Sequence, residues 1–400
     1  MASRGIRDQV AIVCVGCTAF GERWDASTDD LLVDAAHQAL GPTGIDIDAI
    51  DAFWLGTMAS GMSGLPLSAA LKLDYKPVTR VENYCATGSE AFRGACYAVA
   101  SGAYDVAMAI GVEKLKDSGV SGLAVANPPH DGTAVDITGP AAFSFLAAAY
   151  CEAYGIDPAR MKDAMARIAW KNHRNGALNE RAQYRSEVPI ETIRNSPNIA
   201  GMLGIFDCSG VSDGAAAAIV VPAERAYDYT DRPLFVKALA VAAGPTLANL
   251  DPANSYVSIR EVVRSARDAY AQAGIDDPAQ VLAMAEVHDC FTPTELVLME
   301  DLGLSARGAG IDDVMAGRFD RLGELPVNPD GGLKSFGHPI GASGLRMLYE
   351  CWLQLRGEAE ERQIAATTGA AARTLALTHN LGGTPGGCVS FVGIVGSQRD

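Results

Sequence analysis

The chain has 400 residues, of which 48% are hydrophobic and 20% are charged, and its formal net charge is −16. This length predicts two or three domains, and this composition is typical of a folded globular protein rather than a disordered one. The acidic balance argues against a nucleic-acid partner, because phosphate backbones are bound through an excess of Lys and Arg.

The nine cysteines show no paired spacing that would predict a disulfide framework. We therefore expect reduced thiols and a cytoplasmic location. The opening residues MASRGIRDQV lack an apolar signal core, and no apolar run reaches the roughly 18–20 residues of a membrane span. Cys14 and Cys17 form a CxxC, but they lie in a predicted buried strand without a second pair, which favours a structural role over redox or zinc chemistry.

Apolar runs and helical patterns alternate along the first part of the chain. Residues 9–17 (QVAIVCVGC) and the run AIDAFWLGT predict buried strands, and the segment between them predicts a helix with its cap signal at Thr28. A further strand is predicted at 103–113, after a helix that begins near Cys85. This alternation predicts an α/β fold with a mostly parallel sheet covered on both faces.

The pattern changes between about 126 and 204. NPPHDGTAVD predicts a loop, and a polar helical region follows it. Residues 160–194 hold eight Lys or Arg against four Asp or Glu. Such charge runs usually form a solvated helix face. The alternative interpretation is a contact site for an anionic ligand.

The α/β alternation then resumes. Residues 212–226 predict a buried strand, and VLAMAEVHDCF predicts another that ends at His288. The turns CATGS (85–89) and HPIGAS (338–343) are each followed by a helix of similar length and then a strand. This similarity indicates a weak internal duplication in which each half places a reactive residue at a helix N-terminus.

Cys85 is the candidate nucleophile. A helix N-terminus presents free N–H groups and positive potential, which lower the pKa of a thiol, although a lone cysteine is more often a small buried hydrophobe. A nucleophilic thiol also needs a base. His338 lies between Gly337 and Pro339 at a strand-to-helix junction, and His288 lies at the carboxyl end of a strand, where open α/β sheets bind ligands.

Two further features could take part in the same chemistry. Cys290 lies two residues after His288, so both side chains point to one side if the chain is extended. Metal binding by His288, Asp289 and Cys290 is a competing interpretation, but one short cluster is weak evidence and we predict no metal. The glycines of THNLGGTPGG (378–387) would expose N–H groups to an oxyanion, and no nucleotide-binding motif accompanies them.

NYCATGSEA, VHDCF, NPDGGLKSFGHPIGASG and HNLGG, in this order, resemble the thiolase superfamily. HDCF stands where other thiolases carry Asn-Glu-Ala-Phe, which is similar to the sterol-carrier-protein type. KNHRNGALNERAQYRSE, DCSGVSDGAAAA and CWLQLRGEAEERQ also look like that subtype, so the resemblance covers about residues 9–395. It implies two duplicated five-stranded α/β halves in an αβαβα layering, formed by 1–125 with 205–230 and by 231–400, and an inserted loop domain at 126–204.

The resemblance also implies the roles of individual residues. Cys85 would take the acyl group as a thioester, His338 would act as its base, and Cys290 would be the second acid and base. His288 and His338 would hold an enolate oxygen, and the N–H groups of Cys85 and Gly382 would form a second oxyanion hole. Coenzyme A would be a substrate and product rather than a bound cofactor, and the 160–194 segment would be a plausible contact for its phosphates.

The chain departs from most thiolases at one position. They carry the second cysteine in a Cys-x-Gly motif near the C-terminus, whereas the matching residue here is Asn380 and Cys388 lies too far along. In the subtype resembled, the HDCF cysteine takes this role.

The resemblance implies a 3-ketoacyl-CoA thiolase, favoured in the degradative direction of fatty-acid metabolism, that forms a homodimer or a dimer of dimers. A retro-aldolase working with a small OB-fold partner is an alternative, but those relatives rely on tyrosines and look different at the nucleophile. A non-catalytic subunit of an acyl-CoA complex is a third interpretation. The intact Cys and His set argues against it.

Overall fold

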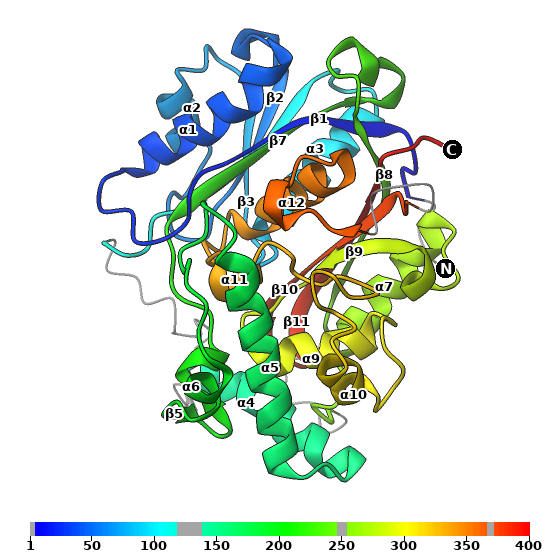
Figure 1. Cartoon of the computed structure of the whole chain (residues 1–400). Coiled ribbons are helices and arrows are strands. Elements are labelled where there is room, and N and C mark those ends of the chain that lie inside the picture. Colours follow the sequence, from blue (N-terminus) through cyan, green and yellow to red (C-terminus); the bar gives the residue numbers. More distant parts are fainter. Residues whose placement is uncertain (1–4, 118–137, 246–253, 366–371) are drawn as a thin grey trace.

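A computed structural model describes residues 5–117, 138–245, 254–365 and 372–400. One sheet of nine strands runs through the molecule (Figure 1). Its strands lie in the order β3 (Val78–Val81), β2 (Ala52–Gly56), β4 (Ala107–Glu113), β7 (Gly214–Pro222), β1 (Val10–Cys17), β8 (Leu234–Ala243), β11 (Gly387–Gly396), β10 (Leu375–Thr384) and β9 (Leu282–Glu286).

The strand order is repeated in two halves. In the first half, β3, β2 and β4 are parallel and β7 runs antiparallel between β4 and β1. In the second half, β9 and β10 are parallel and β11 runs antiparallel between β10 and β8. Val327, which forms a parallel bridge with Ala285, stands where β3 stands in the first half. The halves join where β1 pairs with β8 at Ala11 and Ile12.

The α/β class and the duplicated, layered arrangement are therefore confirmed, with two corrections. The sheet is mixed rather than mostly parallel, because β7 and β11 each run antiparallel to both of their neighbours. A short connection at Pro385 and Gly386 makes β10 and β11 a hairpin, which must be antiparallel. The second half has four strands and a bridge in the described residues instead of five strands.

Helices form three layers around the two halves of the sheet. α1 and α2 cover the outer face of the first half, α3 and α12 pack against each other between the halves, and α7 and α9 cover the second half (Figure 1). The helices are α1 (Thr28–Leu40), α2 (Leu65–Leu71), α3 (Thr87–Ala100), α4 (Gly139–Tyr154), α5 (Pro158–Gly176), α6 (Ile190–Arg194), α7 (Arg260–Ala273), α8 (Pro278–Val281), α9 (Thr292–Asp301), α10 (Gly310–Met315), α11 (Gly332–Ser335) and α12 (Ser343–Arg356).

Local sequence explains where several of these helices begin and which face they bury. α3 buries Ala91, Phe92, Ala95 and Val99, whose three- and four-residue spacing forms one apolar stripe. The cap of α1 is Ser27 rather than the predicted Thr28. The Ser27 hydroxyl accepts from the N–H of Asp30, and the Asp30 carboxylate accepts from the N–H of Ser27, so the two residues form a capping box.

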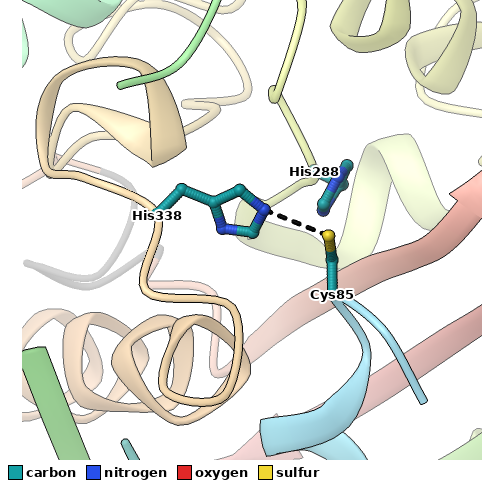
Figure 2. Close-up of side chains that lie close together, drawn as sticks. All are labelled: Cys85, His288 and His338. Carbon is teal, nitrogen blue, oxygen red and sulfur yellow. Dashed lines mark hydrogen bonds between the residues drawn. The ribbon is translucent and has the colours of Figure 1, made fainter. Parts of the chain in front are cut away.

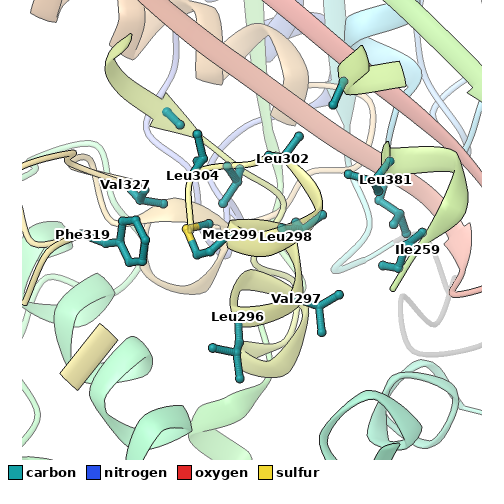
Figure 3. Close-up of a cluster of buried hydrophobic side chains, with 14 of the residues drawn as sticks. Ile259, Leu296, Val297, Leu298, Met299, Leu302, Leu304, Phe319, Val327 and Leu381 are labelled. Atoms are coloured by element: carbon teal, nitrogen blue, oxygen red, sulfur yellow. The ribbon is translucent and has the colours of Figure 1, made fainter. Parts of the chain in front are cut away.

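The segment after β4 contains α4, α5, α6 and a small sheet of β5 (Asn198–Ala200) and β6 (Leu203–Gly204). The predicted loop NPPHDGTAVD lies outside the described residues. α4 and α5 pack on α9, whose side chains contribute to the largest apolar cluster of the second half (Figure 3). Among the helices of the described segments, none combines the length and apolarity needed to cross a membrane.

The eight basic residues at 160–194 have partners within the chain. Arg160, Lys162, Arg167, Lys171, Arg174 and Arg194 form ion pairs with Asp or Glu, and Arg181 and Arg185 donate to main-chain carbonyls. These pairs favour a structural role for most of this segment. The contact with coenzyme A stays a prediction without an assigned residue.

Candidate active site

The nucleophile turn lies between β3 and α3. Cys85 precedes the first residue of α3, Thr87, by two positions. The Thr87 side chain accepts from the N–H of Asn83 at 2.8 Å and so ties the turn to the helix start. Tyr84 adopts a positive φ of 49°, which is uncommon for a bulky residue and concentrates at functional sites. The turn therefore holds Cys85 in one fixed, strained geometry.

His338 lies in the opposite turn, before α12, and two serines hold it. Its backbone N–H donates to the Ser212 Oγ at 2.9 Å, and its Nδ1 lies 2.7 Å from the Ser343 Oγ. The Ser343 hydroxyl donates its one proton to the Pro339 carbonyl at 2.9 Å, so its oxygen accepts from Nδ1–H of His338. This arrangement assigns the tautomer and leaves Nε2 as an acceptor.

The two turns bring a thiol and a base together. The His338 Nε2 lies 3.2 Å from the Cys85 Sγ (Figure 2). The His288 ring stands nearly perpendicular to that of His338, with centroids 5.3 Å apart. One donor atom from each of Cys85, His288 and His338 lies within 4.8 Å of the other two. The structure thus brings together three residues that are spread over 253 positions of the sequence, from Cys85 to His338.

Small residues allow this approach. A methyl group built at Gly344 would lie 2.2 Å from the Ser89 Oγ, and one at Gly88 would lie 2.6 Å from the Gly341 carbonyl oxygen. At Gly111 the distance to the same carbonyl oxygen would be 2.0 Å. The starts of α3 and α12 can therefore touch only because no Cβ separates them. This contact explains why CATGS and HPIGAS are both rich in small residues.

Burial sets the protonation state of the pair. Burial raises the pKa of the Cys85 thiol to about 12, and the charges of Glu113 and Glu82 add to this rise. Burial and the Arg346 charge lower the pKa of His338 to about 3. The net shift at Cys85 is opposite to the one predicted from a helix N-terminus, because desolvation outweighs the N–H groups. The resting pair is a neutral thiol and a neutral imidazole.

His288 and Cys290 are also buried and uncharged. Burial, and then the charge of His338, lower the pKa of His288 well below its usual range. Burial raises the pKa of Cys290 well above its usual range, and the neighbouring Cys85 adds to the rise. The N–H of Ser209 donates to the Cys290 carbonyl at 2.8 Å, which fixes the segment that carries His288 and Cys290.

Asp289 links the two histidine-bearing segments rather than binding a metal with its neighbours. Its carboxylate accepts from the N–H groups of Leu333 and Lys334 at 2.6 and 3.1 Å and from Asn172 at 2.8 Å. A Cβ at Gly332 would lie 2.3 Å from this carboxylate. The competing interpretation, a metal site on three successive residues, is therefore disfavoured, since the Asp289 carboxylate already accepts three hydrogen bonds.

The glycine-rich strand β10 passes behind the nucleophile turn. A methyl at Gly382 would lie 2.3 Å from the Asn83 carbonyl oxygen and 3.0 Å from the Tyr84 Cβ, so its backbone touches the turn that carries Cys85. Asn380 is buried and accepts from the Ser89 Oγ at 2.6 Å. Cys388 lies on β11, where burial and the Glu261 carboxylate raise the pKa of its thiol. Cys388 is not part of the Cys85 cluster.

Sequence reasoning missed the residues that orient the base. Ser212 and Ser343 hold the His338 ring, and only the position of Ser343 next to the Gly341 turn could have hinted at its role. Asp289 was considered only as a metal ligand. Cys14 and Cys17 are buried free thiols in β1, as a structural role requires.

Comparisons with known proteins identify the family of the chain. The family model described as "Thiolase, N-terminal domain" matches residues 10–224, and the one described as "Thiolase C-terminal domain-like" matches residues 246–392. An acetyl-CoA acetyltransferase of Methanothermobacter thermautotrophicus is 38% identical to this chain, over 94% of this chain and 97% of that protein.

More distant relatives extend the comparison. Sterol carrier protein 2 of Homo sapiens is 30% identical over 94% of this chain and 70% of that protein. A solved structure of an Ltp2-ChsH2(DUF35) aldolase has a TM-score of 0.80 at 23% identity and matches over 99% of each chain, which shows the shared fold. The two family models and these relatives, at 30% and 38% identity, show that the chain belongs to the thiolase superfamily.

Proposed function

We propose that the protein is an acyl-CoA acyltransferase that cleaves 3-ketoacyl-CoA with coenzyme A, or runs the reverse Claisen condensation, through a thioester on Cys85. The observation that carries this proposal is the 3.2 Å contact between the Cys85 Sγ and the unprotonated Nε2 of His338. A neutral base in contact with a thiol can take its proton as the sulfur attacks, which is what covalent catalysis by a high-pKa thiol requires.

In the cleavage direction, the Cys85 sulfur attacks the 3-keto carbon while its proton moves to the His338 Nε2. The N–H groups of Cys85 and Gly382 hold the oxyanion that forms on the former ketone oxygen. Gly382 supports this role because its backbone touches the Cys85 turn. Each such donor contributes on the order of 3 kcal/mol to the transition state.

The bond between C2 and C3 then breaks. Its electron pair stays on C2, so the unit that carries coenzyme A departs as an enolate and the acyl group of C3 remains on Cys85 as a thioester. His288 and the newly protonated Nε2 of His338 then hold the enolate oxygen, a role that the 5.3 Å separation of their ring centroids supports (Figure 2). Cys290 donates its proton to C2. The thiol of coenzyme A next attacks the Cys85 thioester and gives its proton to the Cys290 thiolate, and Cys85 regains the proton held by His338.

Intact mass spectrometry after brief exposure to acetyl-CoA tests the first step. We expect one acetyl adduct on the parent protein and none on Cys85→Ala, whose unfolding midpoint should match that of the parent. Cys290→Ala should still accept an acetyl group but should form no carbon–carbon bond. An adduct on Cys85→Ala would refute the nucleophile assignment, and normal condensation by Cys290→Ala would refute the acid and base assignment.

A thiolase-like retro-aldolase is the second candidate, favoured by the TM-score of 0.80 with the Ltp2-ChsH2(DUF35) aldolase. In this case an OB-fold partner would bind the chain. The absence of an adduct with acetyl-CoA and with longer acyl-CoAs would support this candidate or a non-catalytic subunit. To distinguish between the two, the chain is copurified with a DUF35-type protein and aldol cleavage is measured on the complex. Cleavage would support the aldolase, and its absence would support the non-catalytic subunit.

We also propose a homodimer, as the thiolase resemblance implies. Among the described strands β3 lies at the edge of the sheet, and its outer side, which pairs with none of them, could bind a strand of another copy. Tyr75, Met62 and Leu65 near this edge are exposed large apolar residues, which supports a covered surface. Sedimentation equilibrium measures the assembly directly.

A further inference from the structure

Cys85, His288 and His338 form a set of donors suited to a thiophilic metal ion. One sulfur and two imidazole nitrogens, all within 4.8 Å of one another, are the kinds of ligands that zinc prefers (Figure 2). A tetrahedral zinc site with bonds of about 2.3 Å to sulfur and about 2.0–2.1 Å to nitrogen places neighbouring donors roughly 3.3–3.6 Å apart. The Cys85 Sγ and His338 Nε2, at 3.2 Å, already lie near this spacing.

The surroundings of the donors favour metal binding, although donor atoms that lie within 4.8 Å of one another must close to the roughly 3.3–3.6 Å of a tetrahedral site. The His338 Nδ1 is held by Ser343, the outer-shell contact that orients a metal-bound histidine and directs its Nε2 to the ion. The Asp289 carboxylate is turned to backbone N–H groups and supplies no oxygen ligand. Three protein donors leave the fourth position open for water, as in zinc sites that exchange ligands.

The charges around the cluster are mixed. Glu113 and Glu82 act on the Cys85 side and favour a cation, whereas Arg346 acts on the histidine side. Glu286 and Asp330 pair with Arg346 and offset its charge. The balance therefore permits a divalent cation at the sulfur.

We infer that zinc, or another thiophilic divalent ion, binds reversibly across Cys85, His288 and His338 and blocks the enzyme. Binding replaces the thiol proton, which leaves to solvent, by a sulfur–metal bond, and the ion occupies the Nε2 of His338 that otherwise accepts that proton. The inhibitory consequence rests on the proposed function, while the binding itself does not. Magnesium and calcium should not bind, because they require oxygen ligands.

Cobalt(II) titration of the purified, metal-free protein tests the binding without any turnover. We expect one equivalent of cobalt to bind with tetrahedral visible bands and a thiolate-to-metal charge-transfer band in the near ultraviolet, and zinc to displace it. Cys85→Ser should lose the charge-transfer band, and His288→Gln should weaken binding at least tenfold. Cys151→Ser is the matched control, because Cys151 is a partly buried free thiol on α4 outside the cluster.

Acyl-transfer activity is then measured in parallel with zinc or magnesium chloride. We expect more than tenfold inhibition at one equivalent of zinc, full recovery on addition of a chelator, and no effect of magnesium. A charge-transfer band that persists in Cys85→Ser, or no cobalt bound at micromolar concentration, would overturn the inference even if the enzyme is a thiolase. If the protein shows no acyl transfer, the cobalt spectra still decide the site.

Discussion

The buried ion cluster below the active site allows a quantitative test of how the His338 segment is held. Arg346 on α12 pairs through one nitrogen with Glu286 at the end of β9 and with Asp330 in the loop before α11. All three side chains have 0% exposure. Removing one partner of a buried ion pair costs about 3–5 kcal/mol, because the remaining charge is left without compensation. Arg346→Met leaves two such carboxylates and should lower the free energy of unfolding by about 4 kcal/mol.

The loss of stability in Arg346→Met should depend on pH, and the pKa of Glu286 gives the direction of this dependence. Burial, and then the charge of Asp330, raise the pKa of Glu286 well above its usual range, and Arg346 opposes this rise. Without Arg346 the pKa of Glu286 in the folded chain rises further, so the folded variant binds this proton at a pH where the folded parent does not, and falling pH stabilises the variant more than the parent. The deficit relative to the parent should therefore shrink between pH 8 and pH 5.5. The histidines act in the same direction, because the Arg346 charge lowers the pKa of His288 and His338 in the parent and no longer does so in the variant.

Urea unfolding midpoints and slopes, measured for both proteins at each pH, supply the comparison. Arg264→Met is the matched control, since Arg264 on α7 is half-exposed and pairs with Asp268 at the surface. Such a surface pair contributes at most about 1 kcal/mol. If Arg346→Met cost no more than Arg264→Met, or if its deficit grew at low pH, the reasoning from buried charge would be wrong.

Ser343→Ala removes the acceptor that fixes the His338 tautomer and should slow acetylation of Cys85 by about 10- to 100-fold without a comparable loss of stability; an unchanged rate by rapid-quench mass analysis would contradict this role. Gly344→Ala places a methyl 2.2 Å from the Ser89 Oγ and should cost about 1–3 kcal/mol of stability along with activity, whereas Gly41→Ala, where a methyl meets nothing within 4 Å, should change neither. Burial lowers the pKa of His173 to about 3, so the unfolded chain binds a proton that the folded one does not, and stability falls as the pH drops below about 6.5. His173→Phe should reduce that slope by up to about 1.4 kcal/mol per pH unit, and an unchanged slope in urea unfolding would show that His173 does not titrate in this way.

Much of the fold could be predicted from local sequence. β1, β2, β4 and β7 could be predicted from their apolar runs, because a strand buried on both faces needs apolar residues at nearly every position. The repeated small-residue turns at 85–89 and 338–343 indicated the duplication, and the order of four motifs indicated the family. The antiparallel direction of β7 could not be predicted, because it depends on the path of the segment between β4 and β7, which the local sequence does not determine.

The residue types of the candidate site were also set by sequence, whereas their states depend on tertiary packing. Cys85, His288 and His338 could be named from their turns, but only folding brings them within 4.8 Å. The helix-start argument gave the wrong sign for the pKa of Cys85, because desolvation sums over atoms from distant segments. The proton on His338 is placed by Ser343 and Pro339, a contact of turn geometry that no linear pattern encodes. Sequence thus determined which groups are present. Packing decided how close together they lie, how far they are buried from water and which of them carry a proton.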